Sequence, residues 1–166
     1  MFRKEMQTSI EIRASAERVW QVLTDFDAYE EWNPMIRWAS GVAERGGRVT
    51  VRFQPDVQKK ARIFRPKLIT VIPGRELRWL GYPRIPGIFD IDHFWILNPC
   101  GDGRTHLLHG TAILGLSALI AGPMLEGPTR KAFIDMNKAH KARAEHLPDP
   151  RYPLGDPPRS KWDPRH

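Results

Sequence analysis

Cysteine is nearly absent from this chain, which has one cysteine, Cys100, in 166 residues. A single thiol cannot close an intrachain disulfide, so the chain does not belong to the small secreted proteins that disulfides hold together. It also cannot supply a cysteine-rich zinc site, or the two cysteines and two histidines of a Rieske-type iron–sulfur centre. From the remaining residues we predict neither a metal site nor a cofactor.

Long apolar runs are also scarce. The first residues, MFRKEMQTSIEIR, lack the apolar core of a signal peptide. Residues 105–125 carry no formal charge, but Gly115, Gly122 and Pro123 interrupt their apolar part. A membrane span needs about 20 mainly apolar residues. We interpret this stretch as a buried strand that leads into a loop and a helix start, and we predict a cytoplasmic protein. A transient contact with a membrane surface is the alternative.

The common catalytic motifs are missing as well. The sequence has no G-x-S-x-G, no phosphate loop, no H-E-x-x-H and no dinucleotide fingerprint. Charge is uneven: the net charge is +7, and residues 44–67 contain eight basic and two acidic side chains. Because no nucleic-acid motif accompanies the basic segment, we interpret it as a solvated face and predict no specific nucleic-acid partner.

The patterns that are present predict an α+β fold. Residues 6–13 alternate as a strand does, Ser15 can cap a helix that starts at Ala16, and a second short helix stops at Asn33-Pro34. A long amphipathic helix is predicted after Pro128, over residues 129–146. Between these helices lie six strand signals joined by turns too short for helical crossovers, which predicts an antiparallel sheet. They cover residues 35–41, 48–54, 59–72 as one interrupted run, 76–81, 88–97 and 105–116.

We therefore expect a curved antiparallel sheet of about seven strands, wrapped around the long C-terminal helix. Residues 1–147 form one domain in this prediction. Residues 148–166 contain six prolines and form an extended tail.

Residues 10–34, IEIRASAERVWQVLTDFDAYEEWNP, resemble the opening strand and helix pair of the START-like, birch-allergen-like helix-grip (SRPBCC) superfamily. Within it they are most similar to the bacterial polyketide cyclase/dehydrase and lipid-transport group. Three later segments match in the same order: PGRELRW at 73–79, FDIDHF at 89–94 and FIDMNKA at 133–139. The resemblance implies a helix-grip fold, but that fold carries lipid carriers, cyclases and binding proteins alike.

The last hairpin brings two histidines together. A turn centred near Gly101 would pair His93 with His109, and likewise Ile91 with Thr111, Trp95 with Leu107 and Phe89 with Ile113. Cross-strand partners share a face, so these eight side chains should face the concave side of the sheet. Asp90 and Asp92 fall on the opposite face, where we expect water.

Three interpretations of His93 and His109 stay open at this point. They can act as a general acid–base pair, since imidazole titrates near neutral pH. They can ligate a metal, although no carboxylate or thiol is placed to complete the set. They can also be hydrogen-bonded pocket or core residues.

We predict that the chain binds or transports a small hydrophobic ligand, such as a lipid, sterol or polyketide-like molecule, between the sheet and the last helix. The alternatives are a metal-free cyclase/dehydratase-like enzyme that uses His93 and His109, and an interaction module that works through the basic face or the Pro-rich tail. The predicted ligand-binding residues are Trp79, Phe89, Ile91, Trp95, Leu107, Thr111, Ile113, Phe133, Met136, Asn137 and His140.

Overall fold

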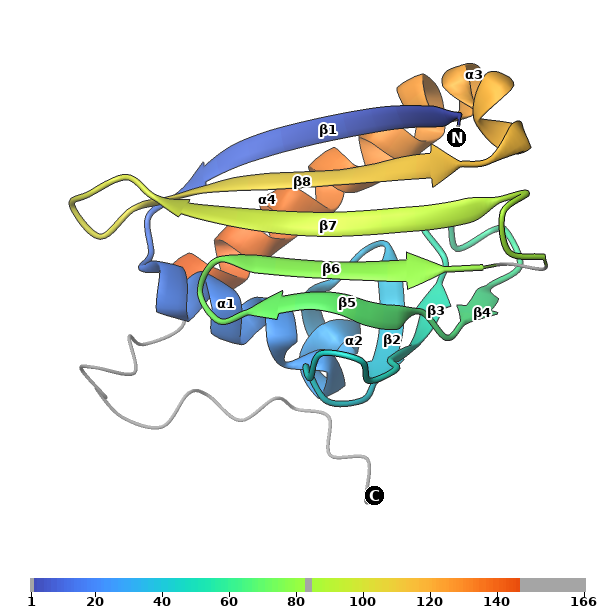
Figure 1. Ribbon diagram of the computed structural model, residues 1–166. Helices are drawn as coiled ribbons and strands as arrows, with labels where there is room; N and C mark the ends of the chain where they lie inside the picture. The colour runs from blue at the N-terminus through green and yellow to red at the C-terminus, as the bar shows by residue number, and fades with distance from the viewer. Residues whose placement is uncertain (1, 83–84, 147–166) are drawn as a thin grey trace.

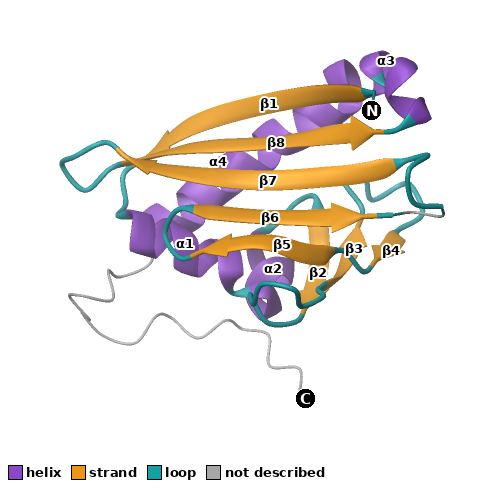
Figure 2. Cartoon of the chain, viewed as in Figure 1, coloured by secondary structure: helices purple, strands orange, loops and turns teal. Residues whose placement is uncertain are grey.

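The computed structural model describes residues 2–82 and 85–146. Its core is a five-stranded antiparallel sheet in the order β1-β8-β7-β6-β5, beside a three-stranded sheet in the order β2-β3-β4. The long helix α4 runs behind the larger sheet, and α1 and α2 lie near the C-terminal end of α4 (Figures 1 and 2). The predicted tail, residues 148–166, lies outside the described residues.

The strands are β1 (Arg3–Ile12), β2 (Ile36–Ser40), β3 (Thr50–Phe53), β4 (Arg62–Phe64), β5 (Lys67–Ile72), β6 (Glu76–Gly81), β7 (Asp90–Pro99) and β8 (Thr105–Leu114). The helices are α1 (Ala16–Thr24), η1 (Phe26–Ala28), α2 (Tyr29–Trp32), η2 (Leu116–Leu119), α3 (Gly122–Met124), η3 (Leu125–Thr129) and α4 (Arg130–His146).

Local sequence explains how the chain enters and leaves its first helix. Ser15 is the N-cap of α1, and its side chain accepts a hydrogen bond from the Arg18 backbone N–H, as predicted. Asn33 ends α2 with extended backbone before Pro34, because proline disfavours helical geometry in the residue that precedes it.

The start of the last helix differs from the prediction. Pro128 lies inside the irregular turn η3 and not at a first helical position, because Gly127 leaves helical geometry there (φ −100°, ψ −111°). Regular α-helix begins at Arg130.

The helix-grip prediction is confirmed, with one difference in the sheet. The strands form two sheets of five and three, where we expected one sheet of about seven. The separation falls between β4 and β5, at Pro66, which has no N–H to donate to a continuous ladder. The isolated Arg48–Lys67 bridge still joins the two sheets at this point.

The predicted register of the β7–β8 hairpin is wrong by two residues. His93 lies opposite Thr111, Trp95 opposite His109, Ile91 opposite Ile113 and Leu97 opposite Leu107. Phe89 precedes β7 and pairs with nothing on β8. Because side chains alternate with a period of two, the shift leaves every strand residue on the face that we predicted.

The opposite face is drier than predicted. Asp90 and Asp92 are buried there, and Asp92 accepts hydrogen bonds from Arg78 (2.8 Å) and Arg3 (3.4 Å). Asp90 accepts one from the Gly87 backbone N–H. These partners replace part of the water that we expected around the two carboxylates, whereas Asp92 Oδ1 is buried without a partner among the described residues.

Within residues 2–82 and 85–146, no helix is long and apolar enough to cross a membrane.

Candidate functional site

Two stacked histidines lie between the concave side of the large sheet and α4. His93 comes from β7 and His109 from β8, two residue pairs apart along the hairpin. Their Nε2 atoms are 2.7 Å apart, and their rings stack with centroids at 4.9 Å. His109 is fully buried, whereas 7% of the surface of His93 remains exposed to solvent. The sequence therefore predicted the pair, although through a register that the structure corrects.

A chain of hydrogen bonds fixes the protons of this pair. The Thr8 hydroxyl donates to the His109 carbonyl, and the Asn137 amide N–H donates to Thr8 Oγ1. Asn137 Oδ1 must then accept from His109 Nδ1–H, at 2.7 Å. A neutral His109 is left with Nε2 as an acceptor, so the His93 Nε2–H donates to it.

Aromatic rings enclose the two imidazoles. Trp95 stacks on His93 with centroids at 4.1 Å, and Phe133 from α4 stacks on His109 at 4.2 Å. Trp79 from β6 meets His93 edge-on at 5.3 Å. These spacings leave no room for a further ring inside the stack.

Burial keeps both imidazoles neutral. Desolvation lowers the pKa of His109 to about 3. Its hydrogen bond to Asn137 raises the pKa, but by less than burial lowers it. Desolvation also lowers the pKa of His93 well below its ordinary value, and the neighbouring His109 lowers it further. At neutral pH the pair therefore acts as uncharged donors and acceptors.

Two polar groups of the stack have no protein partner within the described residues. One is His93 Nδ1, an acceptor once Nε2 carries the proton. The other is Trp95 Nε1, a buried donor. Leaving the buried Trp95 N–H unpaired is costly, so a ligand oxygen that accepts from it would be favoured, and a ligand hydroxyl could donate to His93 Nδ1.

The other predicted site residues divide into those that join the stack and those that do not. Thr111 is buried opposite His93 and donates to the Asp92 carbonyl, at 3.1 Å. Ile91 and Phe89, two and four residues before His93 in the chain, are half-buried. Three further predicted residues are buried in the hydrophobic core: Leu107, Ile113 and Met136.

His140 lies apart from this stack. Its Nε2–H donates to the Val19 carbonyl at 3.0 Å, and its ring lies 5.3 Å from that of Trp32. Desolvation lowers its pKa to about 4. The residue therefore joins α4 to α1, where we predicted an anchor for the ligand.

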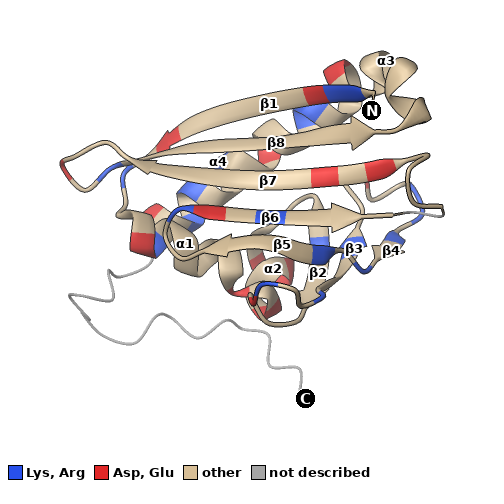
Figure 3. Ribbon diagram, in the orientation of Figure 1, with Lys and Arg blue, Asp and Glu red and all other residues tan. Residues whose placement is uncertain are grey.

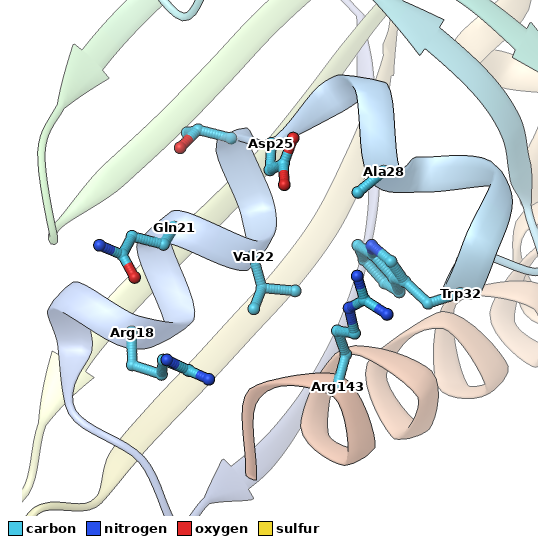
Figure 4. Close-up of a pocket in the computed structure, with 8 residues that line it drawn as sticks. Arg18, Gln21, Val22, Asp25, Ala28, Trp32 and Arg143 are labelled. Atoms are coloured by element: carbon cyan, nitrogen blue, oxygen red, sulfur yellow. The ribbon is translucent and has the colours of Figure 1, made fainter. Parts of the chain in front are cut away.

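A cavity of about 400 Å³ opens between α1, α2 and α4, away from the histidines (Figure 4). None of the predicted site residues lines it. Its lining residues are Arg18, Gln21, Val22, Thr24, Asp25, Ala28, Trp32 and Arg143. The one sequence signal for it is Arg18, a charged residue beside Val19 and Val22 on the apolar stripe of α1.

A second cavity of similar volume lies between α1 and two strand turns, and it too contains none of the predicted residues. Within the part of the chain that the structure describes, no group of three or more histidine, cysteine or acidic side chains is arranged to hold a metal ion.

Comparison with protein families identifies this architecture. Residues 3–145 match the family model described as polyketide cyclase / dehydrase and lipid transport. The chain belongs to this family. Among curated protein sequences, none matches it.

Solved structures with the same fold are distant in sequence. A START superfamily protein from Mycobacterium smegmatis has a TM-score of 0.70 at 19% identity, and the match covers 87% of this chain and 99% of that one. The Zhui aromatase/cyclase from Streptomyces sp. R1128 has a TM-score of 0.66 at 20% identity, covering 86% and 94%. At these identities the likeness shows that this family member shares their fold.

Proposed function

We propose that this family member binds a small, flat, uncharged molecule with one hydroxyl or carbonyl group, against the exposed edge of His93. The observation that supports it is that His93 Nδ1 and Trp95 Nε1 have no hydrogen-bond partner among the described residues. Their rings stack with centroids 4.1 Å apart in an apolar interior. Apolar walls with a few convergent polar groups are typical of small-molecule sites.

The position of the ligand follows from the packing. Because the rings fill the space between His109 and α4, the ligand has to lie beside the stack and not within it. His93 is the member of the pair that keeps some exposure, and Ile91 and Phe89, which precede it in the chain, are half-buried. These two side chains supply an apolar surface that the body of the ligand can cover.

The charge of the ligand follows from its neighbours. The aromatic and hydrogen-bond partners of the two imidazoles include Trp79, Trp95, Phe133 and Asn137, and none of these carries a charge. A carboxylate buried here would lose its hydration without gaining a cation. A neutral alcohol, phenol or ketone avoids this cost.

The same electrostatics favour binding over acid–base catalysis by the histidine pair. A general base works best when its pKa lies near the operating pH. The pKa of His109 is lowered to about 3, and that of His93 is also well below its ordinary value. The cyclase/dehydratase alternative would therefore use both groups far from their optimum.

Three small aromatic probes test this proposal. We expect 1-naphthol to bind more tightly than naphthalene, which lacks the hydroxyl, and than 1-naphthoate, which is charged. His93→Phe keeps a stacking ring but removes the hydrogen-bond acceptor. It should weaken 1-naphthol binding by about 2- to 13-fold, which corresponds to the net free energy of one hydrogen bond. Its affinity for naphthalene should not change. Isothermal titration calorimetry measures all three affinities.

The exposed His106→Phe variant is the matched control, because it makes the same substitution on β8 away from the stack. Equal affinities of the wild type and His93→Phe for 1-naphthol, with folding confirmed by circular dichroism, would overturn the proposal. So would preferential binding of 1-naphthoate.

A further inference from the structure

A cluster of exposed apolar side chains lies where β8 leads into η2 and α3. Leu116 is 62% exposed, Leu119 64% and Ile120 82%. Met124 on α3 is also exposed. We propose that these four residues, the η2–α3 patch, enter the surface of a phospholipid bilayer. The proposal goes beyond ligand binding and does not depend on it.

The patch is continuous with exposed apolar residues from two other segments. The Gly115 backbone N–H donates to the Phe2 carbonyl at 3.0 Å, which holds the start of β1 beside it. Ser117 donates to the Ile88 carbonyl through its backbone N–H (3.1 Å) and its hydroxyl (2.8 Å). Phe2 and Ile88 are both exposed, so the apolar surface extends over three segments of the chain.

Several polar groups of the turn that carries the patch are hydrogen-bonded within the protein. Besides the two donors of Ser117, the Ala118 N–H bonds to the Gly115 carbonyl and the Ile120 N–H to the Ser117 carbonyl. Groups already bonded in this way can enter an apolar layer without losing hydrogen bonds to water.

Charge around the patch also suits a bilayer. Residues 105–125 carry no formal charge, and Figure 3 shows α3 free of charged residues. Two acids that follow α3 in the chain are ion-paired on the protein, Glu126 with Arg130 (2.9 Å) and Asp135 with Lys131 (2.6 Å). Lys4 makes no ion pair among the described residues, and a Cβ at Gly122 would lie 3.7 Å from its Cε. Its ammonium can therefore reach lipid phosphates at the rim of the patch.

The size and shape of the patch argue against a second copy of the chain. A stable protein interface uses about 20–30 residues a side. Here the four residues of the η2–α3 patch, with Phe2 and Ile88 beside them, are far fewer, which suits shallow insertion between lipid head groups.

Sedimentation with phosphatidylcholine vesicles tests the proposal. We expect the wild type to sediment with them, because apolar insertion supplies the affinity, and added salt or phosphatidylglycerol should change this little. The double variant Leu119→Ser/Ile120→Ser should weaken binding by about 100-fold, roughly tenfold for each large aliphatic side chain withdrawn. Both positions are exposed, so the fold should not change.

Ile63→Ser is the matched control, because Ile63 is also an exposed aliphatic residue (59%) but lies on β4. Equal sedimentation of the double variant and the wild type would overturn the proposal. So would wild-type binding that requires phosphatidylglycerol and disappears at high salt, since that indicates the basic strands. A wild-type dimer in light scattering that the double variant abolishes would assign the patch to self-association and overturn it as well.

Discussion

At the residue scale, the interior is shaped by polar side chains that lie among aromatic rings. Thr8, His93, His109, Thr111 and Asn137 are all buried. Each of them makes at least one hydrogen bond, which offsets the free energy lost when a polar group leaves water. His93 is distinguished from the others because one of its two ring nitrogens remains available.

Gly110 on β8 shows how tightly the opposite face is packed. A Cβ at this position would lie 2.5 Å from Phe94 Cζ and 2.8 Å from the Met6 carbonyl oxygen. The Arg78 guanidinium covers the same Phe94 ring, 4.7 Å from its centroid. Phe94 therefore has little freedom to move aside.

Gly110→Ala should accordingly lower the free energy of unfolding by about 1–3 kcal/mol, the usual cost of overpacking. Urea denaturation measures the change. Gly122→Ala is the control, because a Cβ there meets only the flexible end of Lys4 at an ordinary contact distance. A loss of stability as large in Gly122→Ala as in Gly110→Ala would contradict this explanation.

At the element scale, the hairpin β7–β8 shows what the sequence predicts and what it does not. The alternation of apolar and polar residues identified the concave face of both strands correctly. The register depended on the centre of a turn with glycine at both 101 and 103, and the structure places Asp102 between them with φ +52°. Several turn centres suit such a sequence, so the pairing could not be read from it.

The candidate site could be predicted only in part, for a related reason. His93, His109 and Phe133 were identifiable as concave-face or helix-stripe residues. The contact of His140 with Val19, and the cavity between α1 and α4, depend on how two helices meet. Helix packing is fixed by tertiary contacts, and the local sequence carries little sign of it beyond Arg18 on the apolar stripe of α1.

The buried contact of His140 on α4 with Val19 on α1 predicts that the stability of the protein depends on pH. The folded pKa of His140 is about 4, and an unfolded histidine titrates near 6.5. Between these values the unfolded chain binds a proton that the folded chain excludes. The free energy of unfolding therefore falls as the pH decreases from about 6.5 to 4, by up to about 1.4 kcal/mol per pH unit for His140 alone.

His140→Gln keeps a side-chain N–H for the Val19 carbonyl but cannot titrate. We expect its free energy of unfolding, measured by urea denaturation, to depend less steeply on pH than that of the wild type between pH 6.5 and 4. His106→Gln, at an exposed position, controls for the loss of one imidazole. Equal slopes in the two variants would contradict a buried, neutral His140.

At the scale of the whole molecule, three places have to be distinguished: the proposed site at the edge of His93, the cavity between α1, α2 and α4, and the cavity beside the strand turns. Each place has at least one tryptophan, and Trp79 lies in the stack together with Trp95. Trp95 belongs to the stack, Trp32 lines the cavity in Figure 4, and Trp20 lines the other. Trp38 is exposed on β2, apart from all three.

The indole N–H signals in a ¹H–¹⁵N spectrum, recorded while 1-naphthol is added, therefore report which place is occupied. Trp95→Phe assigns the Trp95 signal by its loss. Our account predicts a saturable shift of the Trp95 signal, with the Trp20, Trp32 and Trp38 signals unchanged. A Trp95 signal that stays in place while that of Trp32 or Trp20 moves would contradict it.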